Sequence, residues 1–149
     1  WLLHPMAVHF PVALLFTGFA LHARALWTGG GEWTVPASRW MLWLGTLGGW
    51  AALGLGLLAE RTAPHVPSAW EVLAHHEELA WWTCGTFTAV SGLVFRLVRK
   101  EEPAPRWGRA LATAGWLAGL GLLLYTADHG GQLVFDHNMG TAATGDSER

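Results

Sequence analysis

The sequence predicts an all-α fold, a four-helix transmembrane bundle that forms a single integral-membrane domain over residues 1–149. Hydrophobic residues make up 52% of the chain and charged residues 13%, whereas an average soluble domain carries about 25% charged residues. The mean hydropathy is +0.28, which favours lipid as the solvent. Eleven residues are Trp and one is Tyr, and Trp is enriched at membrane–water interfaces.

The composition also argues against several classes of protein. The formal net charge is −2, and there is no basic groove or phosphate-binding loop, so nucleic acid is not an expected partner. The single cysteine, Cys84, cannot form an intrachain disulfide, and there is no Cys-x-x-Cys-His motif for covalent c-type haem. Because the chain begins at Trp1 rather than Met, we expect further sequence to precede it.

The first span is predicted over residues 5–27 and opens with the stretch from His4 to Pro11, where two prolines bracket the second of two histidines. Pro11 frees the carbonyl four residues earlier, so the helix either begins near Pro11 or kinks there. On an ideal helix, His4 and His9 would point about 140° apart. We therefore do not expect these two histidines to bind one ion as a simple pair.

The second span is predicted over residues 40–59, where small residues such as Gly45, Gly49 and Gly56 recur. Small residues let helices approach closely in lipid. They could also leave room for a flat cofactor, although close packing is the commoner use.

The third span, residues 76–99, is predicted to be the inner part of a helix over about residues 69–99 that opens with a capping box, Ser68–Glu71. At 1.5 Å per residue, such a helix exceeds the roughly 30 Å hydrocarbon core of a bilayer. Its first turns, which carry His75 and His76, should therefore protrude or lie in the headgroup layer.

The two adjacent histidines differ in their helical neighbours. His75 shares a face with Glu71 and Glu78, so we expect it to be solvated. His76 has apolar neighbours at the same offsets, and its face continues through Thr83 into the bundle. His76 is therefore the better candidate for a buried ligand.

The fourth span is predicted over residues 107–127, with Gly115 and Gly119 forming a close-packing stripe. The pair Gly130-Gly131 is expected to end this helix and turn the chain. Residues 128–149 would then form an interfacial C-terminal segment.

Four spans place both termini and the second loop on one side of the membrane. Seven of the nine Lys and Arg residues fall on the other side: Arg24, Arg39, Arg96, Arg99, Lys100, Arg106 and Arg109. By the positive-inside rule this basic side is cytoplasmic. Both termini are therefore expected to face outward, to the periplasm or its equivalent.

Seven of the eight histidines fall on the outer side as well. They are His4, His9, His65, His75, His76, His129 and His137, and only His22 lies near the inner face. Any one of them could be an interfacial residue with satisfied hydrogen bonds. However, four chain segments place histidine side chains at one end of a small bundle. This clustering indicates a cofactor or metal site.

The predicted cofactor is haem b, because helix bundles hold cofactors through inward side chains and imidazole is a good ligand for haem iron. His9 and His76 are the predicted axial pair, each a turn or two inside the outer boundary. Arg61, with His65 behind it, is the predicted counter-charge for the haem propionates.

A second site, for a second haem or a copper ion, is predicted at His4, His129 and His137. No thiolate or carboxylate set accompanies the histidines, which argues against structural zinc, while Asp128 and Asp136 leave a mixed His/Asp metal site open. Because no nucleophile–base pair is specified, we expect an electron-transfer subunit rather than a stand-alone enzyme.

The stretch from His4 to Pro11, together with Gly130-Gly131-x-Leu-Val-Phe-x-x-His137, resembles the bacterial membrane family catalogued as domain-of-unknown-function 2231. Members of that family resemble one another in a His-Pro-x-x-Val-His-Phe-Pro motif, four predicted spans and a histidine that opens the third span. A Gly-Gly-x-Leu-Val-Tyr-x-His-Gly-like element follows the fourth span. The resemblance covers nearly the whole chain, and it matches the family's third-span histidine to His75 or His76.

This chain departs from the family pattern at two positions, with Phe135 in place of the usual Tyr and Asn138 where Gly is common. Members often occur beside or fused to cytochrome-like modules, so the resemblance implies respiratory electron transfer. The expected partners are membrane lipid, other membrane or periplasmic redox subunits, and the quinone pool. The alternatives are a copper-binding membrane protein and a cofactor-free accessory subunit of a membrane complex.

Overall fold

The computed structural model describes residues 3–62, 66–99 and 105–139. Its elements are α1 (Leu3–Ala7), α2 (His9–Thr28), α3 (Thr34–Thr62), the short 3₁₀ helix η1 (Pro67–Ala69), α4 (Trp70–Arg99) and α5 (Arg106–Phe135). All regular secondary structure in these ranges is helical. The all-α prediction is therefore confirmed.

The first span is one helix interrupted near its start. Val8, between α1 and α2, has helical dihedral angles (φ −63°, ψ −26°), and its N–H donates to the carbonyl oxygen of His4. Pro11 has no N–H to donate to Ala7, so the hydrogen-bond ladder is broken for one step. The break between the two helical segments thus lies at Val8, and α2 begins at His9, two residues before Pro11.

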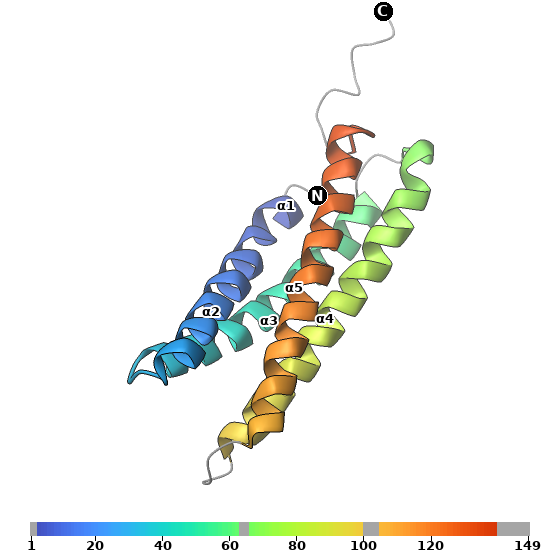
Figure 1. The fold of residues 1–149 in the computed structure, drawn as a ribbon. Coiled ribbons are helices and arrows are strands. Elements are labelled where there is room, and N and C mark those ends of the chain that lie inside the picture. The colour runs from blue at the N-terminus through green and yellow to red at the C-terminus, as the bar shows by residue number, and fades with distance from the viewer. Residues whose placement is uncertain (1–2, 63–65, 100–104, 140–149) are drawn as a thin grey trace, which may run out of the picture.

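The helices form two hairpins, α2 packed on α3 and α4 packed on α5. Figure 1 shows α1, the end of α3, the start of α4 and the end of α5 at one end of the bundle, which we call the terminal end. The turn between α2 and α3 and the start of α5 lie at the opposite end. Sequence segments that carry histidines therefore meet at the terminal end.

A buried apolar core joins the two hairpins. Its members are Leu15, Leu42, Phe87, Val90, Trp116 and Leu120. The indole N–H of Trp116 donates to the carbonyl oxygen of Leu15 over 3.2 Å, which ties α5 to α2. A Cβ on Gly119 would lie 2.9 Å from the Phe87 ring, so the absence of a side chain there lets α4 and α5 approach closely.

In the described part of the chain, three helices are long and apolar enough to cross a membrane: the joined segment Leu3–Thr28, Thr34–Thr62 and Arg106–Phe135. Large apolar side chains such as Leu47, Trp82 and Leu124 are exposed on the bundle; in a membrane-embedded protein they contact lipid. α4 is equally long. It falls outside this set, and its first turns carry the charged residues Glu71, Glu77 and Glu78.

The fourth helix is longer than predicted. Gly130-Gly131 was expected to turn the chain, but α5 continues through both glycines to Phe135. The helix ends there with the N–H of Asp136 donating to the carbonyl oxygen of Gln132. The predicted helix end is therefore wrong, since residues 128–135 continue α5. Glycine permits a helix end without imposing one, and here a tertiary contact with His76 uses the bare Gly130 backbone.

Candidate functional site

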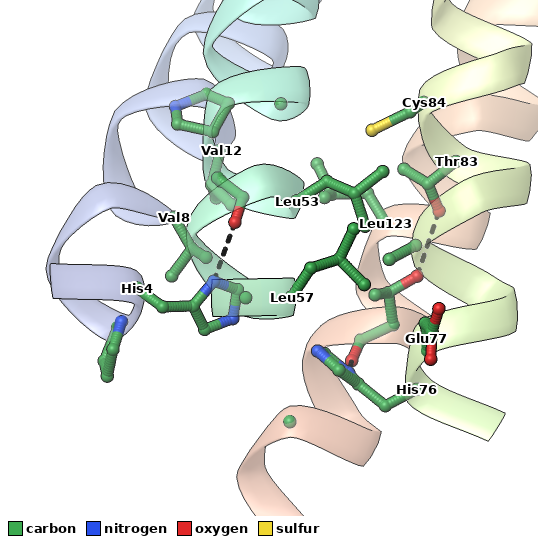
Figure 2. Close-up of a pocket in the computed structure, with 18 of the residues that line it drawn as sticks. His4, Val8, Val12, Leu53, Leu57, His76, Glu77, Thr83, Cys84 and Leu123 are labelled. Carbon is green, nitrogen blue, oxygen red and sulfur yellow. Dashed lines mark hydrogen bonds between the residues drawn. The ribbon is translucent and has the colours of Figure 1, made fainter. Parts of the chain in front are cut away.

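A cavity of about 330 Å³ lies between the two hairpins and extends to the terminal end. Its walls are mainly apolar, with Val8, Leu53, Leu57 and Leu123 among the lining residues (Figure 2). Sites for small molecules and cofactors are typically concave and apolar with a few placed polar groups, and occupy about 300–1,000 Å³. The cavity has the character of such a site and lies at the lower end of that range.

His4, on α1, lines this cavity and is half-buried. Its Nδ1–H donates to the carbonyl oxygen of Ala52 on α3 over 2.9 Å. A carbonyl can only accept, so this bond places the proton on Nδ1 and leaves a lone pair on Nε2. Gly56 makes room for the ring, since a Cβ there would lie 3.0 Å from Cε1 of His4.

His76, on α4, has the same arrangement in the other hairpin. Its Nδ1–H donates to the carbonyl oxygen of Thr126 on α5 over 2.9 Å, and a Cβ on Gly130 would lie 3.1 Å from its Cε1. The Thr126 hydroxyl bonds that of Thr83 over 2.9 Å. The ring is therefore held on a rigid part of the α4–α5 hairpin, with Nε2 free to accept.

The two imidazoles face one another across the cavity, as Figure 2 shows. Their ring centroids are 6.2 Å apart and their planes are inclined at 85°. A metal–imidazole bond is about 2 Å long and the ring nitrogen lies about 1 Å from the ring centre, so two imidazoles on opposite sides of one ion have centres about 6 Å apart. The spacing of His4 and His76, the histidine pair, suits ligation of one ion from two sides.

The predicted partner of His76 was His9, and the structure places that residue elsewhere. His9 is exposed, and its Nδ1–H donates to the carbonyl oxygen of Pro5 one turn earlier over 2.7 Å. It is not among the residues that line the cavity, whereas His4 is. The cause is the helical rotation between the two positions, which turns His4 inward when His9 faces outward.

Arg61, the predicted counter-charge, is exposed near the end of α3. The carboxylate-bearing residue before it, Glu60, lines the cavity instead. His65 lies outside the described residues.

The predicted second site is not assembled in the described part of the chain. His129 bonds to the carbonyl of Tyr125, and His137 is half-buried beyond the end of α5. Within residues 3–62, 66–99 and 105–139, no group of three or more His, Cys, Asp or Glu side chains could hold a metal ion. His4, His129 and His137 therefore do not converge as predicted.

Two further residues line the cavity that the sequence did not lead us to expect there. Glu77 lines the cavity and accepts a hydrogen bond from the indole of Trp81 over 3.3 Å. Cys84 is buried deeper in the same wall. Cys84 follows His76 by eight residues, so helical periodicity could have placed it on the same face. No comparable pattern marked Glu77.

These features define the class of protein: a helical membrane protein with an apolar cavity between two hairpins and an imidazole on each side of it. The chain belongs to the family of predicted membrane proteins DUF2231, whose profile matches residues 2–143. Neither a search of curated proteins nor one of solved structures finds a match to the chain.

Proposed function

We propose that this protein binds b-type haem in the cavity, with His4 and His76 as axial ligands, and transfers electrons within a larger membrane complex. The observation that carries the proposal is the histidine pair itself. The two imidazoles come from different hairpins and face one another in a mainly apolar cavity, with their ring centroids 6.2 Å apart. Haem supplies one-electron redox chemistry when bound.

The donor set suits haem iron. Metal-ligating histidines usually donate their other ring N–H to a carbonyl or carboxylate, which fixes the ring and raises its basicity. Both members of the pair make this bond, to Ala52 and Thr126. Two neutral imidazole ligands add no charge of their own to a site whose walls are apolar.

The neighbouring residues exclude water and hold the ligands in place. Leu53, Leu57 and Leu123 line the space beside the pair (Figure 2), and Gly56 and Gly130 let the two rings approach the helix backbones closely. Because each ligand belongs to a different hairpin, ligation would join the two halves of the bundle at the end where the apolar core does not reach.

The expected location is a bacterial inner membrane, with the histidine pair on the periplasmic side. Six of the seven described Lys and Arg residues belong to helix ends opposite to the terminal end, and only Arg61 lies at the terminal end. The six are Arg24, Arg39, Arg96, Arg99, Arg106 and Arg109. The positive-inside rule then favours a cytoplasmic location for that opposite end. Electrons would pass to or from a periplasmic redox subunit or the quinone pool.

The first test is a reduced-minus-oxidised absorbance spectrum of the full chain, produced in a bacterium with sufficient haem and purified in detergent. A sharp α band and a b-type pyridine haemochrome are expected. His4→Ala and His76→Ala should each lose most of the bound haem, because each removes an axial ligand.

His9→Ala is the matched control, since His9 lies in the same motif but is exposed and bonds only to its own helix. It should retain the wild-type spectrum. Loss of haem in His9→Ala with retention in His4→Ala would overturn the ligand assignment. A flat spectrum from intact protein would overturn the haem proposal, and metal analysis would then separate a copper protein from a cofactor-free accessory subunit.

A further inference from the structure

A second pair of imidazoles meets at the terminal end, outside the cavity. The ring centroids of His75 on α4 and His129 on α5 are 6.4 Å apart, with planes inclined at 58°. Neither residue lines the cavity. His75 is exposed and His129 is half-buried, so an ion in water can reach both rings.

His129 is already oriented for ligation. Its Nδ1–H donates to the carbonyl oxygen of Tyr125 over 3.1 Å, which leaves the lone pair on Nε2. The Tyr125 ring packs edge-on against it, with centroids 4.6 Å apart and planes at 79°. A metal-binding histidine usually donates a hydrogen bond of this kind from the ring nitrogen that does not bind the metal.

The charge around His75 favours a cation. Glu71 and Glu78 are exposed four residues before and three residues after it, so they share its face of α4. Asp128, next to His129, instead accepts a hydrogen bond from the Gln132 amide over 2.8 Å. The protein thus offers two imidazoles directly, with carboxylates that raise the local concentration of cations.

From this juxtaposition we propose that His75 and His129 form a surface site for a divalent transition-metal ion, with water in the remaining positions. Two imidazoles that ligate one ion have ring centres up to about 6 Å apart, so only a small adjustment of the exposed His75 is needed. Cu²⁺ is the divalent ion expected to bind most tightly, because it has the highest affinity for nitrogen donors in the first-row series. This site is separate from the histidine pair and does not depend on haem binding.

The test is a titration of the metal-stripped full chain in detergent with Cu²⁺ and Zn²⁺, followed by calorimetry, with electron paramagnetic resonance for Cu²⁺. The expected result is a Cu²⁺ site that depends on His75 and His129, binds Cu²⁺ more tightly than Zn²⁺ and shows couplings from two nitrogen ligands. His75→Ala and His129→Ala should each weaken binding about tenfold or more, because each removes one of the two protein ligands.

His9→Ala is the matched surface control and should bind Cu²⁺ like the wild type. Wild-type affinity in both His75→Ala and His129→Ala would overturn the proposal, as would a loss of binding only in His4→Ala or His76→Ala, which would assign the ion to the cavity. Circular dichroism and gel filtration of each variant identify misfolded protein. Because the titration needs no haem, its failure is distinguishable from failure of the haem proposal.

Discussion

At the scale of single residues, the site depends on two glycines as much as on two histidines. Gly56 and Gly130 lie against the rings of His4 and His76, at distances where any Cβ is crowded. The backbone carbonyls of Ala52 and Thr126 each accept a hydrogen bond from Nδ1–H of the ring beside them, which fixes the ring orientation. A side chain at either glycine would therefore push an imidazole away from its position in the pair.

Gly130→Ala tests this contact. The added Cβ would lie 3.1 Å from Cε1 of His76, so the ring must move by a few tenths of an ångström. We expect haem affinity to fall about tenfold, which corresponds to about 1.4 kcal/mol, as measured by haem titration of the apoprotein.

Gly121→Ala is the control on the same helix, because a Cβ there meets nothing within 4 Å. It should leave haem affinity unchanged and stabilise the helix by roughly 0.5–1 kcal/mol. Equal haem affinity in Gly130→Ala and Gly121→Ala would show that the glycine contact does not hold His76 in place.

At the scale of elements, the packing of α1 on α3 brings the inward-facing histidine of the first span into the cavity. Pro11 is buried and packs near Gly48 on α3. Pro11 leaves the carbonyl of Ala7 without its usual helical donor, and α1 packs on α3. That packing brings His4 to Ala52 while His9 stays exposed.

Pro11→Ala would restore an N–H that can donate to Ala7 and complete the hydrogen-bond ladder between α1 and α2. We expect His4 to move away from His76 and haem content to fall by half or more, by the pyridine haemochrome assay, as one ligand is displaced. Helix content by circular dichroism should not decrease.

Pro36→Ala is the control for loss of a proline. Pro36 is exposed in the first turn of α3, where a missing N–H costs nothing. Haem content should be unchanged in this variant. If Pro11→Ala also keeps full haem, the interruption does not position His4.

At the scale of the whole molecule, the two hairpins are joined by different means along the bundle. The core around Leu42, Phe87 and Trp116 joins them through apolar contact. The cavity lies between them toward the terminal end, and there the rings of His4 on α1 and His76 on α4 meet across it. A ligand held by both imidazoles would complete the connection.

Haem loading should therefore stabilise the whole chain. Free haem at about 100 times its dissociation constant adds about 2.7 kcal/mol to the free energy of unfolding, measured by thermal unfolding in detergent with and without haem. His4→Ala and His76→Ala should lose this increment, and His9→Ala should keep it. Equal increments in all four proteins would place the haem elsewhere.

The helical class, the membrane character and the gathering of histidines at one end were all predictable from the sequence. Long apolar segments with few charges can satisfy their backbone in lipid only as helices, so their number and order bring particular segments together. His76 could be preferred to His75 because helical periodicity separates an apolar face from a polar one. The structure agrees, with His76 on the cavity and His75 exposed.

Only the tertiary structure decided which imidazoles meet. The choice of His4 over His9 depends on how α1 packs on α3, and on a carbonyl of α3 that lies 48 residues away in the chain. The pairing of His75 with His129 depends on the register between α4 and α5. Local periodicity fixes the face of a helix to which a side chain belongs, but rotation and register between helices follow from packing across the whole bundle.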